Sequence, residues 1–396
     1  MTKNSLKNGP DELGYYGEGE SAMGGMAVGE TLMPALHELN LAFEDAIKDK
    51  AFLDEFAYYC KHYIGRPSPL YYAENLSNKL GGAKILFKQE HLNHTGSHKI
   101  TNSLFQVLLA KRMGKKNLIC ESGAGQHYSA TAAVAAKFGI PLIGVMGEVD
   151  IKRVNQNIIK AKHYGAKLKA VPGTLKEAIT DAIKTWITNP DYYYVCGSAV
   201  SSFPFPKIVQ FAQSIIGREI REQCLEQEKK LPNMIIGCVG GGSNFIGSIH
   251  EFLDEPNIKK IGVEAAETAA LTHGTPNIMQ GMKSYMLASS DGSKSLGGSS
   301  LGAGIQYFGV GPQHSYLKDQ GAVTYTSATD KEILNAYKVV AQSEGISSAL
   351  EPMAAAAEVL KQAKGKPKDF IIVLSLCGRG EKDLDTIEEH MGKDFE

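Results

Sequence analysis

The sequence predicts an α/β protein with two mainly parallel, twisted sheets covered by helices. Short β-type runs alternate with helical stretches along most of the chain, and this alternation is typical of parallel sheets covered on both faces. The length of 396 residues favours two domains. A hydrophobic content of 43% is that of an ordinary soluble globular chain.

Each expected strand is a short apolar or β-branched run bounded by polar or glycine-rich segments. The expected strands are Lys84 to Lys88, Asn117 to Glu121, Leu142 to Met146, Lys167 to Val171, Tyr192 to Val195, Met234 to Val239, Lys260 to Glu264 and Phe370 to Leu374. In open α/β sheets, ligands bind outside the carboxyl ends of the strands. The polar and glycine-rich segments that follow several of these runs are therefore the first candidates for a site.

Two segments lack this periodicity. The first thirty residues are rich in Gly, Glu, Ser and Tyr, so we expect a surface arm, either a partner contact or a flexible end, before a helix that begins near Leu32. Residues 281 to 312 are rich in Gly and Ser and predict a long loop. In a compact domain such a loop is more often functional than idle.

Composition excludes several classes of partner. The net charge of −1 gives no electrostatic footprint for nucleic acid or an anionic membrane, so small neutral or zwitterionic ligands fit better. The six cysteines are scattered without a Cys-x-x-Cys motif, and the N-terminal residues contain no apolar signal core. We therefore expect a reducing, cytoplasmic location.

Lys99 is the first candidate for chemistry. An apolar stripe, Ile100, Leu104, Val107 and Leu108, predicts a buried helix that places Lys99 at its rim. There its amine is able to hold an aldehyde cofactor. By itself a lysine in this position is more often a solvated charge, so the assignment depends on other segments.

A glycine run follows one of the expected strands and opens a helix. In Val239-Gly240-Gly241-Gly242-Ser243-Asn244, consecutive glycines let backbone N–H groups turn toward one point, and the helix start adds unpaired donors. This pattern favours a phosphate cup. The alternative is a plain glycine loop in which Ser243 or Asn244 only caps the helix.

A second strand-to-helix turn carries a carboxylate. The run Glu121-Ser122-Gly123-Ala124-Gly125-Gln126-His127 precedes an alanine-rich helix, and its small residues suit a bound carboxylate. The alternative is a simple turn with a satisfied histidine. Glu121 argues against that alternative, because a carboxylate at the end of a buried strand is costly unless it is paired or used.

Two further segments complete the set. Cys377 lies at the tip of the last expected strand, in Leu374-Ser375-Leu376-Cys377-Gly378-Arg379-Gly380; taken alone it is best explained as a buried structural thiol. The run from Gly298 to Tyr307 belongs to the long loop and is either a lid or a plain glycine loop.

Together these motifs resemble the tryptophan synthase β chain, from residue 15 to residue 385. The shared motifs are His98-Lys99, Glu121 to His127, Gly240 to Asn244, Cys377-Gly378-Arg379-Gly380, Gly65 to Leu70, Thr174 to Ala178 and Val310 to His314. The resemblance implies a pyridoxal 5'-phosphate enzyme of fold type II with two interlocked α/β domains. The N-terminal domain would comprise 1–64 and 98–213, with a mobile part that closes over substrate, and the C-terminal domain 65–97 and 214–396.

The resemblance also implies a role for each candidate residue. Lys99 would form the internal aldimine and move the substrate's α-proton, and Glu121 would be the acid/base carboxylate that helps activate the acceptor. The cofactor-binding residues would be His98, Lys99, Asn102, Gly240, Gly241, Gly242, Ser243, Asn244, Glu351 and Cys377. The substrate-binding residues would be Ser122, Gly123, Ala124, Gly125, Gln126, His127 and Gln306. A monovalent cation would be held by backbone carbonyls of Gly240, Tyr307 and Gly309.

The implied reaction is a β-replacement that converts L-serine and indole to L-tryptophan and water through an aminoacrylate. In the family a serine occupies the position of Cys377 beside the pyridine nitrogen. A thiol is a weaker donor but is also uncharged, so the chemistry class is retained. The implied assembly is a homodimer, which an α chain would extend to α2β2.

Several residues depart from the family pattern on the substrate side. Gln306 replaces an aspartate that contacts the donor's hydroxyl and pairs, on closure, with the arginine matched by Arg153; an amide cannot form that ion pair. Tyr128 and Met279-Gln280 change the space for the acceptor. The alternatives are therefore a homologue that uses O-phosphoserine, O-acetylserine or another nucleophile, a β-eliminase, or a non-catalytic protein that binds a partner through its N-terminal arm.

Overall fold

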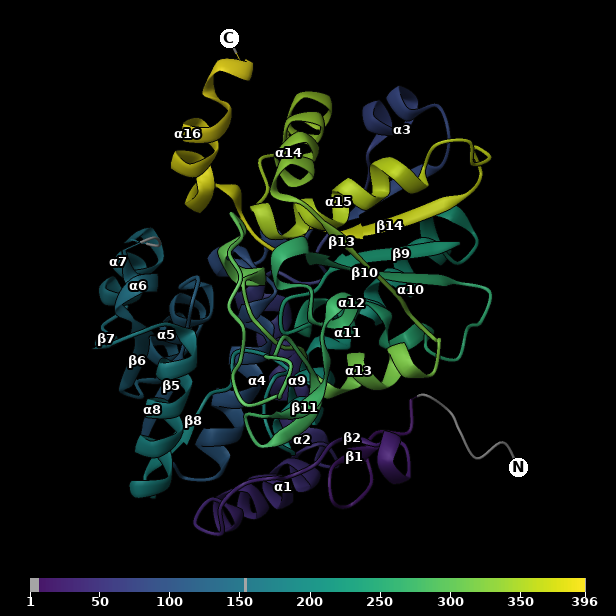
Figure 1. Ribbon diagram of the computed structural model, residues 1–396. Helices are drawn as coiled ribbons and strands as arrows, with labels where there is room; N and C mark the ends of the chain where they lie inside the picture. Colours follow the sequence, from purple (N-terminus) through teal and green to yellow (C-terminus); the bar gives the residue numbers. More distant parts are fainter. Residues whose placement is uncertain (1–6, 153–154, 396) are drawn as a thin grey trace. The chain divides into compact units, whose positions relative to one another are not determined.

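The computed structural model describes residues 7–152 and 155–395 and has an α/β architecture in which helices cover parallel sheets (Figure 1). The chain divides into two compact units, each built from separated stretches of sequence. Unit 1 contains residues 7–27, 68–92 and 198–395, and unit 2 contains residues 28–67 and 93–197. Within the described residues, no helix is both long and apolar enough to span a membrane.

Unit 2 is built around a four-stranded parallel sheet with the order β7-β6-β5-β8. Its strands are β5 (Asn117–Glu121), β6 (Leu142–Gly147), β7 (Lys167–Val171) and β8 (Tyr192–Tyr194). Its helices are α1 (Met33–Ala46), α2 (Lys50–Tyr59), the π-helical turn η2 (Cys60–Ile64), α4 (Lys99–Arg112), α5 (Gln126–Phe138), α6 (Glu148–Ile151), α7 (Asn155–His163) and α8 (Leu175–Thr188). Helix α8 packs on β5 and β6, and α4 packs on α5.

Helix α4, which begins at Lys99, is held by an aromatic cluster. The ring of Phe105 makes edge contacts with Phe43 of α1 and with Phe52 and Phe56 of α2, at centroid distances of 6.0, 5.5 and 5.3 Å. Such edge-to-face pairs stabilise beyond the area they bury. Because every residue from Ile100 to Ala110 is buried, the helix is anchored along its length and Lys99 is fixed at its start.

Unit 1 contains a six-stranded sheet with the order β13-β10-β9-β14-β4-β3, parallel except for the edge strand β3. Its strands are β3 (Leu70–Tyr72), β4 (Lys84–Lys88), β9 (Met234–Cys238), β10 (Lys259–Ala265), β13 (Thr324–Ala328) and β14 (Ile371–Ser375). All five residues of β9 and of β14 are buried, as expected for central parallel strands with both faces covered.

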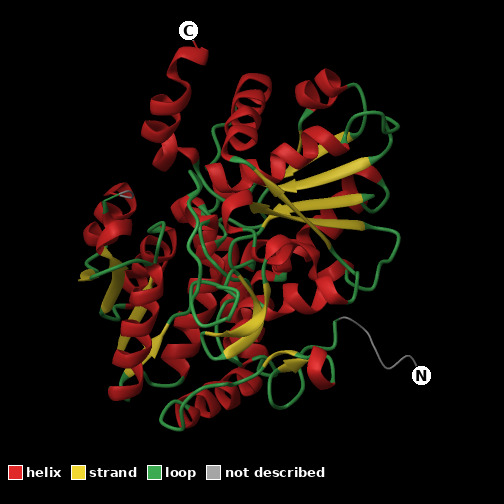
Figure 2. Ribbon diagram, viewed as in Figure 1, coloured by secondary structure: helices red, strands yellow, loops and turns green. Residues whose placement is uncertain are grey.

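Helices cover both faces of this sheet (Figure 2). One face packs against α3 (Glu74–Leu80), α14 (Asp330–Glu344), α15 (Leu350–Gln362) and α16 (Leu384–Phe395). The other packs against α10 (Ile215–Glu228), α11 (Ser243–Ile249), α12 (Ala270–His273) and α13 (Pro312–Asp319). Helix α9 (Phe205–Gln213) lies beside α11.

A small antiparallel sheet in unit 1 corrects two expectations. Strands β1 (Tyr15–Tyr16) and β2 (Met23–Gly24) of the N-terminal arm join β12 (Met282–Met286) and β11 (Thr275–Met279) in the order β1-β2-β12-β11. Residues 281 to 312 are therefore not one continuous loop, and the arm is partly built into the fold. Periodicity does not reveal strands of two residues, because two residues cannot display an alternation.

The expected strands and the fold class are confirmed, with ends shifted by at most one residue, whereas β3 and β13 were not predicted. The units divide the chain differently from the expected domains at four places. Residues 65–67 and 93–97, expected in the C-terminal domain, belong to unit 2. Residues 7–27 belong to unit 1 because β2 pairs with β12, and residues 198–213 belong to unit 1 because α9 packs on α11. The expected mobile, substrate-closing part stays a prediction.

Candidate functional site

Lys99 and Glu121 meet at one residue of unit 2, Gly197. The Lys99 ammonium donates a hydrogen bond to the Gly197 carbonyl, and the Gly197 N–H donates to Oε1 of Glu121 at 3.0 Å. Lys99 comes from the start of α4 and Glu121 from the end of β5. The structure therefore brings together two predicted catalytic side chains that are distant in sequence.

Glu121 lies in an environment that favours its neutral form. The side chain is 6% exposed, and burial raises the pKa of its carboxyl above the ordinary value. Its second oxygen, Oε2, has no hydrogen-bond partner in the part of the chain that the structure describes. A buried carboxyl oxygen without a partner is costly for stability, and such groups cluster at functional sites.

His127 is a satisfied core histidine. Its Nε2 lies 2.8 Å from the carbonyl of Val195, and burial lowers its pKa to about 3, so the ring is neutral and Nε2 is the protonated nitrogen that donates this bond. The His127 side chain therefore has a structural role, as the alternative interpretation of this turn expected. Any contact of His127 with a substrate carboxylate would come from its backbone N–H.

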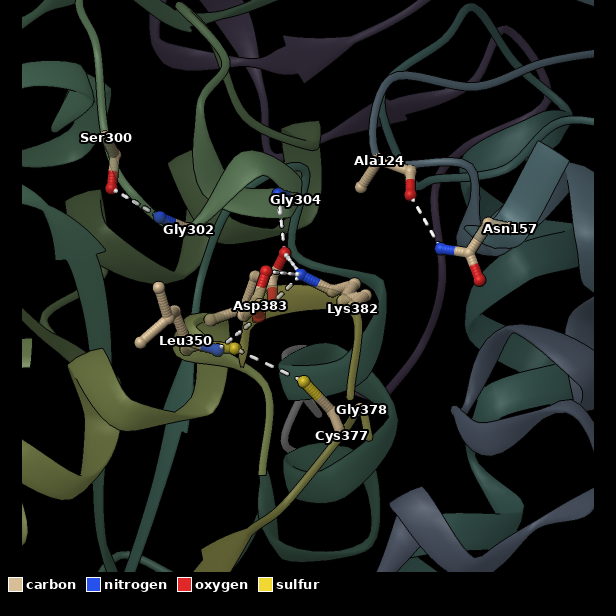
Figure 3. A network of polar contacts seen from close by, with 12 residues as sticks. Ala124, Asn157, Ser300, Gly302, Gly304, Leu350, Cys377, Gly378, Lys382 and Asp383 are labelled. Carbon is tan, nitrogen blue, oxygen red and sulfur yellow. Dashed lines mark hydrogen bonds and ion pairs between the residues drawn. The ribbon is translucent and has the colours of Figure 1, made fainter. Parts of the chain in front are cut away.

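The loop from Ser122 to His127 is fixed by a hydrogen bond from a side chain of α7. Asn157 donates its side-chain amide to the Ala124 carbonyl at 2.9 Å (Figure 3). Gly125 has φ of +73°, and a side chain there would come within 2.7 Å of Cβ of Asn157. Only glycine fits this left-handed and crowded position, so the loop is fixed before α5 begins.

His98 and Asn102 lie in the same unit on either side of Lys99. His98 is 7% exposed and directly precedes α4. Asn102 is fully buried; it donates to the Cys196 carbonyl at 2.8 Å and accepts from Gln106 at 2.8 Å. The Asn102 side chain therefore fixes the segment that leads to Gly197.

The segment Val195 to Gly197 is a part of the site that the sequence did not single out. It follows β8 and accepts or donates hydrogen bonds with the side chains of Lys99, Asn102, Glu121 and His127. The signal available in the sequence was its position at the carboxyl end of an expected strand. No chemically distinctive side chain marks it, because the backbone makes these contacts.

In unit 1, the predicted phosphate cup lies between β9 and α11. Gly242 has φ of +94° and caps α11. A Cβ at Gly240 would lie 2.6 Å from the Gly304 carbonyl, and one at Gly241 would lie 1.8 Å from Oγ of Ser198. Close packing requires glycine at all three positions, and the left-handed backbone conformation requires it at Gly242 as well.

The cup contains a buried donor without a partner. Oδ1 of Asn244 accepts from the Ser375 hydroxyl at 2.8 Å, which orients the amide, whereas Nδ2 is buried and has no hydrogen-bond partner among the described residues. An unpaired N–H donor at a helix start suits an anion. The residues present therefore fit a bound phosphate group.

Cys377 lies just beyond the end of β14, next to a second thiol. Its Sγ is 3.5 Å from Sγ of Cys238 at the end of β9, and both side chains are buried (Figure 3). The sequence pattern did not predict this pair. All six cysteines are free thiols.

Glu351 is a further expected cofactor residue in unit 1. Its Oε1 accepts from the Gly304 N–H at 2.7 Å and from the Lys382 ammonium at 2.9 Å, beside Asp383 (Figure 3). Burial alone would raise the pKa of the Glu351 carboxyl, but the Lys382 charge together with the hydrogen bonds from Lys382 and the backbone lowers the pKa below its ordinary value. Glu351 is an ionised, paired carboxylate that fixes the Gly304 backbone.

The remaining predicted residues have mixed outcomes. Gln306 donates its side-chain amide to the Gly298 carbonyl at 3.1 Å, and Tyr307 receives a long 3.4 Å contact from the Gln280 amide. Gly309 bridges to Met286. The cation site of Gly240, Tyr307 and Gly309 stays a prediction, and Arg153 lies outside the described residues.

Tyr128 lies in the interior of unit 2. It is fully buried, and its ring covers Gly144 of β6, where a Cβ would lie 2.2 Å from the ring. The tyrosine therefore uses space that the glycine leaves open between α5 and the sheet. This contact gives it a packing role, and an effect on the acceptor stays a prediction.

Comparison with known proteins places these features in context. A family model described as pyridoxal-phosphate dependent enzyme matches residues 62–378. A tryptophan synthase beta chain of Allorhizobium ampelinum is 47% identical and aligns over 98% of each chain. One of a Methylobacterium species is 46% identical over 99% of this chain and 98% of its own.

A solved structure supports the fold. The crystal structure of a T.th. threonine deaminase superposes with a TM-score of 0.64, covering 87% of this chain and 98% of its own, at 20% sequence identity. At that identity the likeness concerns the fold alone. It agrees with the predicted fold class.

Proposed function

The chain belongs to the tryptophan synthase β-chain family of pyridoxal-phosphate dependent enzymes, and from this we propose that it condenses L-serine with indole to give L-tryptophan and water. The resemblance found in the sequence is thereby confirmed, and the protein is a pyridoxal-phosphate dependent lyase. The structural observation that carries the proposal is the meeting of Lys99 and Glu121 at Gly197.

The two catalytic residues divide the proton transfers. When bound, pyridoxal phosphate supplies an electron sink that makes the substrate's α-proton removable. Lys99 holds the cofactor and carries that proton at Nζ. Glu121 exchanges a proton through Oε2, and burial raises the pKa of its carboxyl, which favours the protonated form.

Other residues bind and orient. Gly240 to Asn244 bind the phosphate through backbone N–H groups and the Asn244 amide, while the loop from Ser122 to His127 binds the substrate carboxylate through backbone N–H groups. Cys377 provides an uncharged thiol for the pyridine nitrogen. His98, Asn102 and Glu351 complete the cofactor-binding set.

The test is product formation by purified protein supplied with pyridoxal phosphate. L-serine and indole should give L-tryptophan, measured by chromatography. Lys99→Ala should reduce the rate of tryptophan formation by at least about 10³-fold. After treatment with borohydride, the wild-type peptide that contains residue 99 should carry the added mass of the cofactor, and the variant peptide should not. Lys111→Ala, on the same helix but in an exposed ion pair with Glu55, is the matched control. Wild-type protein that makes no tryptophan from serine and indole would contradict the proposal.

A second candidate differs only in the donor. Gln306 is uncharged and its amide is engaged by the Gly298 carbonyl, which favours a donor that does not need a carboxylate partner for its hydroxyl. O-phosphoserine or O-acetylserine would then exceed serine in rate, with indole or another nucleophile as acceptor. Serine without indole should be assayed for pyruvate, because a β-eliminase releases it.

We also propose a homodimer in the cytoplasm, with an α chain as a further partner and a monovalent cation at the carbonyls of Gly240, Tyr307 and Gly309. Free thiols support the location. Sedimentation equilibrium tests the dimer, with and without an added α chain.

Replacing K⁺ with tetramethylammonium tests the monovalent cation. An unchanged rate of tryptophan formation would count against a role for the cation.

A further inference from the structure

Two carbonyls of the phosphate cup accept hydrogen bonds from one segment of unit 1, Gly311 to His314, and the Gly242 carbonyl also accepts from the Ile246 N–H at 3.0 Å. The Gly311 N–H donates to the Gly241 carbonyl at 3.1 Å, and Nε2 of His314 lies 2.8 Å from the Gly242 carbonyl. Both acceptors belong to the turn that leads into α11. The segment at the start of α13 therefore fixes the backbone of the cup.

Because a peptide unit is planar, these two hydrogen bonds also fix the directions of the N–H donors that follow each carbonyl. In a trans peptide, the C=O of one residue and the N–H of the next point in opposite directions. Fixing the Gly241 carbonyl fixes the N–H of Gly242, and fixing the Gly242 carbonyl fixes the N–H of Ser243. Both N–H groups thus point away from α13.

The His314 ring has one protonation state that suits this role. It is fully buried, and burial lowers its pKa to about 4, so the ring is neutral. Nδ1 lies 2.8 Å from the Tyr325 hydroxyl, whose pKa is raised by burial. Because the Gly242 carbonyl can only accept, the ring proton is on Nε2, and Nδ1 accepts a hydrogen bond from the protonated Tyr325 hydroxyl.

Packing leaves the ring no alternative position. The His314 ring stacks on Phe245 of α11 at 5.9 Å with an interplanar angle of 6°, and it meets Tyr325 edge-on. A Cβ at Gly242 would lie 2.1 Å from Cδ2 of His314. The glycine is therefore needed partly to admit this histidine.

We propose that His314, oriented by Tyr325, is a positioning residue that aligns the backbone N–H groups of Gly242 and Ser243 for the cofactor phosphate. The proposal rests on the proposed function, since it assigns the cup's ligand as a phosphate. His314 touches neither substrate nor cofactor in this scheme and acts only through the Gly242 carbonyl. Tyr325 acts one step further back by selecting the histidine tautomer.

The test compares two ligands of the full-length apoenzyme: pyridoxal phosphate, and pyridoxal, which lacks the phosphate. His314→Leu should weaken pyridoxal phosphate binding by about tenfold, the effect of one lost hydrogen bond, and leave pyridoxal binding unchanged. Tyr325→Phe should act in the same direction by about threefold, because the other tautomer becomes accessible. His314→Gln, whose amide can still donate to a carbonyl, should recover part of the loss.

Gln313→Met is the matched control. Gln313 is buried on the same helix and donates to Pro206 and Gln210, without a hydrogen bond to the cup. Its replacement should lower thermal stability without changing the ratio of the two affinities. An equal loss for both ligands in the His314 and Tyr325 variants, or the same change of ratio in Gln313→Met, would overturn the proposal.

The outcome is separable from that of the proposed function. Wild-type protein that binds pyridoxal phosphate no better than pyridoxal would remove the phosphate assignment itself. Wild-type protein that prefers pyridoxal phosphate, with a preference unchanged in His314→Leu and Tyr325→Phe, would overturn only the role of His314. Tyr325→Phe keeps the proposal testable if His314→Leu does not fold.

Discussion

At the scale of single residues, Gly197 organises the candidate site although it has no side chain and contributes only backbone atoms. Gly197 accepts from Lys99 through its carbonyl and donates to Glu121 through its N–H. A Cβ there would lie 2.5 Å from the His127 ring and 3.0 Å from Oε1 of Glu121. The backbone at this position is shared by both side chains, which explains why a search for reactive side chains overlooks it.

Glu121→Gln should lower the rate of tryptophan formation by about 10²- to 10⁴-fold, because the amide cannot exchange a proton. It should also stabilise the apoprotein at neutral pH. The pKa of Glu121 is raised in the folded state, so stability falls as pH rises from the ordinary glutamate range through that raised pKa, and the variant lacks this fall. The expected gain is on the order of 1 kcal/mol at pH 8.

Urea unfolding of both apoproteins at pH 4 and pH 8 measures this difference. Glu219→Gln is unsuitable as a control because Glu219 pairs with the buried Lys88; the exposed Glu55→Gln is the better reference. If the stability difference between Glu121→Gln and wild type is the same at both pH values, burial does not raise the pKa of the Glu121 carboxyl.

Cys377 permits a matched pair of substitutions. Cys377→Ser restores the family's hydroxyl and should keep kcat within about tenfold of wild type, because an uncharged donor is retained. Cys377→Ala removes the donor and should lower kcat further while leaving tryptophan as the product. Steady-state kinetics of both variants measure this. Equal rates for the serine and alanine variants would exclude a role for the thiol in the reaction.

At the scale of elements, the two turns proposed to bind anions are each fixed by a side chain from another helix. Asn157 of α7 holds the Ala124 carbonyl before α5, and His314 of α13 holds the Gly242 carbonyl before α11. In both cases a left-handed glycine at the helix cap packs against the residue that holds the loop. The N–H donors of a helix start are thus oriented before any ligand binds, which reduces the cost of binding.

Asn157→Leu should raise the KM for the amino-acid donor by about tenfold, since one hydrogen bond that fixes the loop is lost. The value of kcat should change much less, because neither Lys99 nor Glu121 contacts Asn157. Initial rates over a range of serine concentrations give both constants. Lys160→Ala, on the exposed face of the same helix, should leave KM unchanged. A fall in kcat alone would contradict a loop-fixing role.

The elements themselves were largely predictable, because buried parallel strands are continuous apolar runs and glycine clusters mark their ends. Strand β13 was not, since Thr324–Ala328 is mostly polar and only partly buried. Of the site, the sequence supplied Lys99, Glu121 and the glycine cup. His314 was noted only as the last residue of a shared motif, without a role, and Tyr325 and Asn157 were not singled out, because their contacts depend on tertiary packing that no local pattern encodes.

At the scale of the whole molecule, the candidate residues are distributed over two units that each combine distant stretches of sequence. Unit 2 carries Lys99, Glu121 and the loop from Ser122 to His127, while unit 1 carries the cup, Glu351 and Cys377. Each set has its own supporting contacts within its unit. The proposed function assigns cofactor-binding roles to residues in each of the two sets, and this assignment has a direct physical consequence.

Binding of pyridoxal phosphate should slow amide hydrogen exchange in both units, because a ligand that binds only the folded state suppresses local opening wherever it makes contacts. Protection should rise at Gly240 to Asn244 and also around His98 and Lys99, measured by mass spectrometry of the apoprotein with and without cofactor. Pyridoxal should protect the Lys99 segment but not the cup, since it lacks the phosphate. Lys99→Ala should lose protection at the start of α4 while the cup retains part of its own. Protection confined to one unit would contradict the cofactor-binding role proposed for the residues of the other unit.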